Sequence, residues 1–205
     1  DPAELHGLLE ASGVHWLNVA GVHDAGLLER VGTALELHPL TVEDVASLGQ
    51  RPKVEEYEGY LFMVVRMLSH VEANGAALRS EQLSLVLRDR LLVTFQESQE
   101  SPFEPLLERM RQGGDRARKM GADYLAYSLI DLVVDQYFAV LEEYGDELET
   151  LEGEVLLGPS RGQMERVNAL RRHLLIVRRA VWPLRDVMAS LLRKDLPYFT
   201  DEVGD

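Results

Sequence analysis

The sequence contains no cysteine, so disulfide bonds and thiolate metal sites are excluded. Its six histidines show no His-x-x-x-His or His-Glu-x-x-His spacing, which argues against a zinc hydrolase. The sequence also lacks a glycine-rich phosphate loop and a serine in a nucleophile-elbow context. These absences leave no catalytic constellation, and we expect that the protein is not an enzyme.

Long apolar runs and targeting signals are also missing. No uninterrupted apolar run reaches the roughly 18 residues that a membrane-spanning helix needs. The N-terminal residues 1–6 have no basic region and do not form a signal peptide. Because the chain starts without methionine and stops at Asp205 in the middle of an expected element, we expect it to be a fragment.

Acidic residues are abundant. The chain has 35 acidic and 21 basic residues, which give a formal net charge of −14. Such a charge repels nucleic acid and anionic membrane surfaces but attracts cations. With 46% hydrophobic residues the chain can also build a real core.

The charges are separated along the C-terminal half. Residues 123–154 contain ten carboxylates and no Lys or Arg, whereas residues 161–194 contain nine basic and two acidic residues. A break at Leu157-Gly158-Pro159-Ser160 separates these two segments. Two long helices of opposite charge, folded back on each other, would neutralise most of these charges, so we predict ion pairs between them.

The first hundred residues have a mixed α and β pattern. Strands are predicted at residues 14–19, 60–67, 82–87 and 91–96, and short helices at 25–35, from about 38–39 onward and at 103–111. Loops are expected at Asn74-Gly75 and Asp89-Arg90. Three leucines in residues 82–87 alternate with other side chains, which predicts a half-buried antiparallel strand.

From about Gly121 apolar residues recur every three or four positions, which predicts two long helices. Each would be about 48 Å long at 1.5 Å per residue, so the helix hairpin should project from the rest of the molecule. Pro183 lies inside the second helix, where we expect a kink or a lost hydrogen bond.

Glu43 and Asp44 lie in the first turns of the helix predicted after Pro39. They can simply complement the helix dipole, which is worth roughly 0.3–1 kcal/mol for each acid. Adjacent carboxylates are also suitable ligands for Mg²⁺, which binds through one or two carboxylates and keeps most of its waters. The residues alone leave both interpretations open.

Asp131 and Asp135 are four residues apart and therefore share one helix face, where like charges repel. A nearby arginine of the basic segment would account for Asp135, whereas Asp131 is harder to explain structurally. Asp201 and Asp205 show the same spacing at the C-terminal end.

Several short strings, in order and spacing, closely resemble the cytoplasmic part of CorA-type magnesium/cobalt transporters, from about Trp16 to Phe199. They are His38-Pro39-Leu40-Thr41-Val42-Glu43-Asp44, Gln50-Arg51-Pro52-Lys53-Val54-Glu55, Tyr60-Leu61-Phe62, Glu81-Gln82-Leu83-Ser84, Val93-Thr94-Phe95-Gln96-Glu97 and Ala180-Val181-Trp182-Pro183-Leu184-Arg185.

The resemblance implies an α/β (α+β) fold: an α/β/α domain with a mostly antiparallel sheet (residues 1–115), a projecting helix hairpin (116–196) and the start of a stalk helix (197–205). It further implies a homopentamer on the cytoplasmic side of the inner membrane. Mg²⁺ bound between neighbouring subunits would hold the pore closed. The two membrane helices and their Gly-Met-Asn signature are absent, so the chain would be a sensing domain that reaches the membrane only through those helices.

The resemblance also implies metal ligands. Glu43 and Asp44 match the family's Glu-Asp pair after His-Pro-Leu, and Asp131 matches the Asp of its Ser-Leu-Ile-Asp stretch. Asp201 matches the family's stalk Asp. The family commonly reads Tyr-Phe-Arg-Asp-Val-Tyr-Asp-His here, and this chain shifts the second Asp by one, so either Asp201 or Glu202 is the expected stalk ligand.

Two other functions remain open. A ZntB-type zinc transporter domain shares this architecture, and the sequence does not separate Mg²⁺, Co²⁺ and Zn²⁺ as the bound ion. A soluble interaction module that docks through its hairpin would need no metal at all. The sequence predicts no nucleic-acid partner for any of these.

Overall fold

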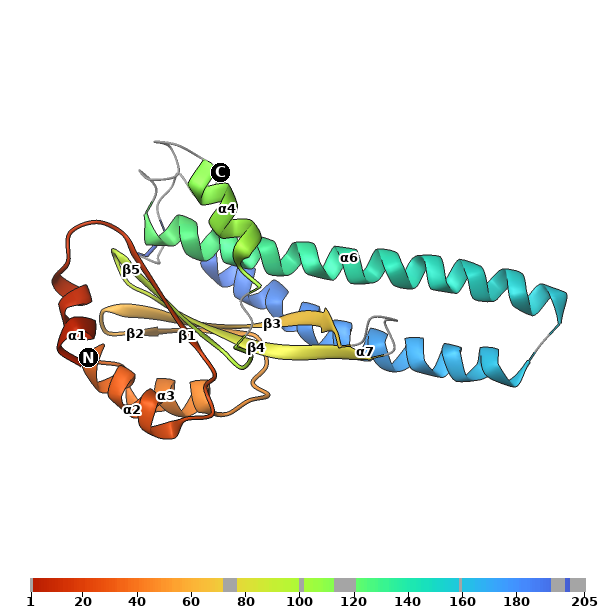
Figure 1. Ribbon diagram of the computed structural model, residues 1–205, viewed down its shortest axis with the longest axis horizontal. Coiled ribbons are helices and arrows are strands. Elements are labelled where there is room, and N and C mark those ends of the chain that lie inside the picture. Colours follow the sequence, from red (N-terminus) through yellow and green to blue (C-terminus); the bar gives the residue numbers. More distant parts are fainter. Residues whose placement is uncertain are drawn as a thin grey trace.

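The structure is a computed structural model that describes residues 2–71, 77–99, 102–112, 121–158, 160–192 and 198–199. At its centre is a five-stranded sheet in the order β1-β5-β4-β3-β2 (Figure 1). The strands are β1 (His15–Ala20), β2 (Lys53–Tyr57), β3 (Tyr60–His70), β4 (Leu78–Leu87) and β5 (Leu91–Gln96). β1 pairs with β5 in parallel and the other neighbours are antiparallel, so the sheet is mostly antiparallel, as predicted.

Helices cover both faces of the sheet (Figure 1). The first layer consists of α1 (Pro2–Glu10), α2 (Ala25–Ala34) and α3 (Pro39–Ala46). The second layer consists of α4 (Glu104–Gln112), α6 (Ala122–Leu157) and α7 (Arg161–Leu191). The predicted α/β fold with an α/β/α arrangement and a long helix hairpin is therefore confirmed. The predicted limits between its parts, at residues 115–116 and 196–197, lie outside the described residues.

The sequence patterns located four of the five strands, and β5 has the predicted bounds. The sequence analysis missed α1 and the edge strand β2, whose three charged residues give no apolar alternation. The prediction for β4 was wrong in one respect. Its residues 81–87 are all buried, because helices cover both faces of the strand, whereas a half-buried strand was expected.

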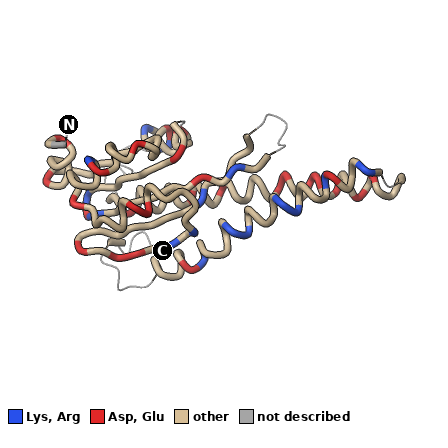
Figure 2. Tube along the Cα trace, turned by 90° about the horizontal axis from the view of Figure 1, so that it is seen from below, with Lys and Arg blue, Asp and Glu red and all other residues tan. Residues whose placement is uncertain are grey.

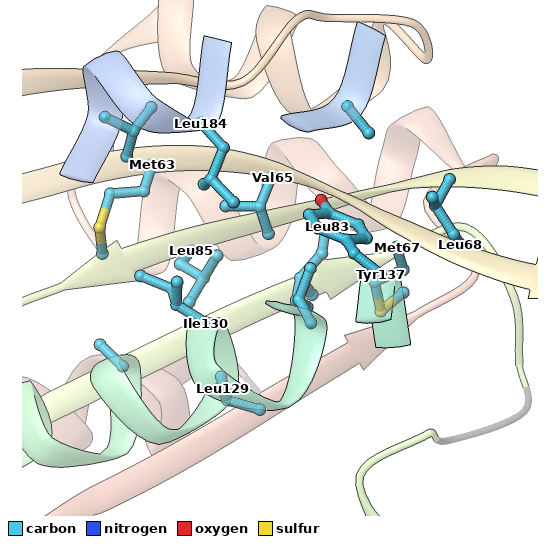
Figure 3. Close-up of a cluster of buried hydrophobic side chains, with 14 of the residues drawn as sticks. Met63, Val65, Met67, Leu68, Leu83, Leu85, Leu129, Ile130, Tyr137 and Leu184 are labelled. Atoms are coloured by element: carbon cyan, nitrogen blue, oxygen red, sulfur yellow. The ribbon is translucent and has the colours of Figure 1, made fainter. Parts of the chain in front are cut away.

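Each face of the sheet has its own apolar core. Phe62, Val64 and Val86 point toward α2 and α3 and form one cluster with Leu28 and Val45. The alternate strand residues belong to the second cluster, which includes α6 and α7. Figure 3 shows this second cluster, in which Met63, Val65, Leu83 and Leu85 of the sheet meet Leu129, Ile130, Tyr137 and Leu184 of the long helices.

The two long helices extend well beyond the sheet (Figure 1). α6 ends at Leu157 and is followed by Gly158, whose backbone φ of 145° is rarely adopted by residues other than glycine. α7 begins after Ser160, which forms a capping box with Gln163. The helix continues through Pro183 to its end at Leu191. The predicted break between the helices is thus confirmed.

The predicted charge neutralisation between the helices is wrong. Within the described residues, Arg166 is the one arginine of α7 that pairs with α6, through Glu147 at 2.7 Å and Glu154 at 2.8 Å. Ion pairs need facing positions within about 4 Å, and net charge along a helix does not ensure this. Figure 2 shows how acidic and basic positions follow separate helices along the hairpin.

An aromatic and histidine contact joins the helices near the end of β3. The rings of Tyr144 on α6 and His173 on α7 stack with centroids 5.5 Å apart, and Tyr144 Oη lies 3.3 Å from His70 Nε2. His70 Nδ1 lies 3.2 Å from a carboxylate oxygen of Glu143. Burial lowers the pKa of His173 below its ordinary value, and the neighbouring His70 and Arg172 lower it further. This contact therefore favours neutral His173.

By length and composition, α6 is the helix among the described residues that is apolar enough to cross a membrane. Its most apolar 18-residue window is 44% buried inside the molecule. Leu125, Leu129 and Val133 of this helix belong to the core beneath the sheet. This packing accounts for part of the apolar character of α6.

Candidate cation-binding site

The helix α3, which carries Glu43 and Asp44, is fixed at its N-terminal end by local capping. Pro39 occupies the first helical turn, and His38 Nδ1 accepts a hydrogen bond of 3.2 Å from the backbone N–H of Leu40. The Tyr60 hydroxyl accepts a 2.9 Å hydrogen bond from the His38 backbone N–H and lies 2.7 Å from the Thr41 hydroxyl. Because Tyr60 and Thr41 are buried, these bonds attach α3 firmly to β3.

The C-terminal end of α3 is fixed by Gln82 of β4, which is only 2% exposed. Gln82 Nε2 donates to the backbone carbonyl of Asp44 at 2.9 Å and to the Ser84 hydroxyl at 3.1 Å. Gln82 Oε1 accepts from the backbone N–H groups of Gly49 and Gln50 at 3.2 and 3.1 Å. One buried amide thus places both the Asp44 backbone and the loop that leads to β2.

An open groove of about 440 Å³ lies between α3 and β2. It is lined by Leu40, Glu43, Asp44, Glu55, Glu56 and Tyr57. Four of these six side chains are carboxylates, so the groove is strongly negative. Glu43 is exposed and Asp44 is half-buried, which leaves both near solvent and near each other on one helix. The arrangement is suited to a hydrated, oxygen-ligated cation.

The cation that the structure places at this groove is the ammonium group of Lys53. Lys53 Nζ lies 2.6 Å from Asp44 Oδ2 and 2.9 Å from Glu55 Oε1, and it sits 5.6 Å from the centre of the Phe62 ring. Burial alone would lower the pKa of Lys53, but the hydrogen bonds and charges of Asp44 and Glu55 outweigh it and raise the pKa above its ordinary value. Lys53 therefore stays charged at neutral pH.

The other predicted ligands do not join this groove within one chain. Asp131 is on α6, whose core residues pack against the sheet face opposite to that of α3. Asp201, Glu202 and Asp205 lie outside the described residues. In the described part of the chain no three His, Asp or Glu side chains are grouped closely enough to hold a metal ion. Among the described residues of one chain, the groove therefore offers a cation its own carboxylates and not Asp131.

Asp131 is partly exposed on α6, and Asp135 is exposed. Neither carboxylate forms an ion pair with another described residue. The expectation that a basic residue of α7 neutralises Asp135 is thus wrong. Both carboxylates remain available on the surface of α6.

Three charged side chains at the groove were not among the predicted site residues: Lys53, Glu55 and Glu56, which all come from β2. The missed strand explains the omission, because only the pairing of β2 with β3 carries these residues toward α3. The signal that could have identified these residues was the charged sequence Lys-Val-Glu-Glu, which follows soon after the helix that carries Glu43 and Asp44.

A second cavity, of about 710 Å³, has the opposite character. Arg51 and Arg66 line it from the sheet side, and Arg178 and Arg179 line it from α7. Among the described residues that line this cavity there is no carboxylate, so the cavity repels cations. The negative groove beside α3 is therefore the better candidate for a metal ion.

Comparison with known proteins shows the family of this chain. A family model described as CorA-like Mg²⁺ transporter protein matches residues 11–204. The cobalt/magnesium transport protein CorA of Thermotoga maritima is 41% identical over 200 residues, which are 94% of this chain and 57% of that protein. The putative metal ion transporter YfjQ of Bacillus subtilis is 30% identical over 158 residues, which are 77% of this chain and 48% of that protein. The chain spans about half the length of these relatives.

Solved structures share the fold. The CorA magnesium transporter of Methanocaldococcus jannaschii superimposes with a TM-score of 0.76 at 23% identity, over 92% of this chain and 58% of that one. Its soluble domain gives a TM-score of 0.74 at 23% identity, with 92% and 74% covered. The ZntB cytoplasmic domain of Vibrio parahaemolyticus gives 0.68 at 11% identity, with 92% and 72% covered. At such identities the likeness concerns the fold alone.

Proposed function

Because the chain belongs to the CorA-like Mg²⁺ transporter family, we propose that it is the cytoplasmic, divalent-cation-sensing domain of a Mg²⁺/Co²⁺ transporter. The observation that carries the proposal is the negative groove beside α3, with four carboxylates and a single ammonium group. The two ends of α3 are fixed by Tyr60 and Gln82, so the backbone that carries Glu43 and Asp44 is held in place before any metal binds.

In this proposal the metal joins two copies of the domain in a homopentamer. Glu43 and Asp44 supply carboxylates from one copy, and Asp131 or the C-terminal Asp201 supplies them from the next. Without metal these acids repel each other across the interface. A bridging divalent ion turns that repulsion into attraction and stabilises the closed transporter, by as much as the difference of its affinity for the two states.

The groove favours a hard cation that keeps part of its hydration shell. Its ligands in one copy are carboxylate oxygens without histidine, which suits Mg²⁺ better than Zn²⁺. Few protein ligands also mean weak binding, as a sensor of cellular Mg²⁺ needs. In this proposal, membrane helices outside the part of the relatives that this chain spans conduct the ion, and the domain lies on the cytoplasmic side of the membrane. The net charge of −14 disfavours nucleic acid as a partner.

A thermal-melt titration of the chain with Mg²⁺, Co²⁺, Zn²⁺ and matched NaCl tests the proposal. At ten times its dissociation constant a metal should add about 1.4 kcal/mol, which raises the melting temperature by about 3–5 °C. Asp44→Asn should abolish this gain. Asp135→Asn removes the same charge from an exposed position on α6 and should keep the gain.

Sedimentation velocity on the same samples should show association that depends on Mg²⁺ and is lost in Asp44→Asn. An equal response to NaCl would reveal general screening and contradict the proposal. A response to Zn²⁺ alone would favour the ZntB-type alternative. No response to any metal would favour a soluble interaction module.

A further inference from the structure

We propose that Lys53 is an internal competitor of the divalent cation: its ammonium group occupies the carboxylates of Asp44 and Glu55 when metal is absent and must leave them when metal binds. The inference rests on the proposed function, since it concerns the same groove. In this inference, Lys53 sets the metal concentration at which the domain responds.

The geometry places the ammonium group where a metal ion would be bound. Lys53 Nζ bridges Asp44 on α3 and Glu55 on β2 at 2.6 and 2.9 Å, which are the lengths of charge-assisted hydrogen bonds. The side chains of Lys53 and Asp44 are only 20% and 19% exposed, so the pair is well shielded from solvent. The Phe62 ring beneath the ammonium group holds it further in place.

Lys53 and a metal ion compete for Asp44 Oδ2, the oxygen that the ammonium group contacts. A divalent ion on Asp44 Oδ2 would sit within the contact distance of the ammonium group, and two cations so close repel strongly in a partly buried site. The lysine stem is long and flexible, and Glu55 has a 40% exposed side chain, so the ammonium group can swing outward toward solvent. Metal binding therefore exchanges one bound cation for another.

This exchange favours divalent over monovalent ions. A monovalent ion that displaces Lys53 replaces one positive charge by an equal charge and gains little. A divalent ion brings twice the charge to the four carboxylates around the groove. Lys53 thereby weakens the binding of every cation, but divalent ions still bind more tightly than monovalent ions. The site therefore does not respond to Na⁺ and K⁺.

The test measures the Mg²⁺ midpoint of the thermal-melt response for wild type and for Lys53→Met, Lys53→Gln and Lys53→Arg. Lys53→Met and Lys53→Gln should lower the midpoint about tenfold, within the usual range of coupling between two ligands, and should let NaCl stabilise the protein. Lys53→Arg keeps the charge and should keep a high midpoint. Arg79→Gln removes a cation from the pair with Glu81 on β4 and should leave the midpoint unchanged.

A second readout follows the ammonium group directly. Acetylation of Lys53, read by mass spectrometry in the intact chain, should be slow without metal and faster at saturating Mg²⁺, because the ammonium group has then left Asp44. A wild type that responds to Mg²⁺ while Lys53→Met keeps its midpoint would overturn this inference alone. If neither wild type nor Lys53→Met responds to any divalent ion, the proposed function fails and the inference fails with it.

Discussion

Replacing Gln82 by leucine should release the C-terminal end of α3 while keeping the volume of the side chain. The wild-type amide takes part in four hydrogen bonds, with the backbone of Asp44, Gly49 and Gln50 and with the hydroxyl of Ser84. Leucine can make none of them, and the position is 2% exposed, so water cannot easily replace the amide.

The magnitude follows from these bonds. A buried polar group that loses its hydrogen-bond partner destabilises the folded state by about 1–3 kcal/mol. The backbone N–H groups of Gly49 and Gln50 in the loop can partly form hydrogen bonds with water instead. We therefore expect Gln82→Leu to lower the free energy of unfolding by about 3–5 kcal/mol, near the upper end for single substitutions. Ser84→Ala is the matched control, since it removes one partner of Gln82 and should cost about 1 kcal/mol.

Urea unfolding followed by far-UV circular dichroism measures both losses, and the Mg²⁺ titration measures the effect on the groove. Gln82→Leu should weaken the Mg²⁺ response in addition to lowering stability, because Asp44 is no longer held in place. If Gln82→Leu costs no more than Ser84→Ala, or if it leaves the Mg²⁺ midpoint unchanged, the view that Gln82 positions the site is wrong.

Two further predictions concern the packing of α3 and the helix hairpin. Gly32→Ala should destabilise by about 1–2 kcal/mol despite the gain in helix propensity, because a Cβ there would lie 2.6 Å from Val42 Cγ2; the double substitution with Val42→Ala should recover part of the loss in urea unfolding. Because the pKa of His173 is lowered in the folded protein, the unfolded chain binds more protons, and stability should fall as the pH drops below about 6.5. His173→Gln should reduce this loss in melts recorded between neutral and mildly acidic pH, and an unchanged pH profile would contradict the assignment.

The sequence predicts an element of this structure well when the signal for that element lies in residues adjacent in the chain. The bounds of β5 and the break before α7 follow from residues adjacent in the chain, and both agree with the structure. The edge strand β2 has no such pattern, because its alternation is masked by charges and its pairing with β3 is set by the turn before Tyr60. Sequence reasoning proposed Glu43 and Asp44 from their place in a short helix and from the family resemblance, and it missed Lys53, whose ammonium group lies 2.6 Å from Asp44.

The charge pattern of the hairpin led to a wrong prediction. Counting charges predicted extensive pairing between α6 and α7, yet within the described residues Arg166 alone bridges them. The helices meet instead through apolar residues and through the ring contact of Tyr144 with His173. Net charge is a property of the composition, whereas an ion pair depends on the rotation and spacing of the two helices. A count of charges along the sequence contains no information on either.

The positions of the candidate ligands bear on how copies of the domain assemble. Glu43 and Asp44 belong to the helical layer on one face of the sheet, and Asp131 belongs to the layer on the other. If these acids share one metal ion between copies, two different surfaces must meet, so the interface is head-to-tail. A head-to-tail interface repeats from copy to copy and closes into a ring when the rotation allows it, whereas a two-fold dimer would bring identical surfaces together. If the proposed metal link exists, the separation of these acids within one chain therefore predicts head-to-tail contacts between subunits.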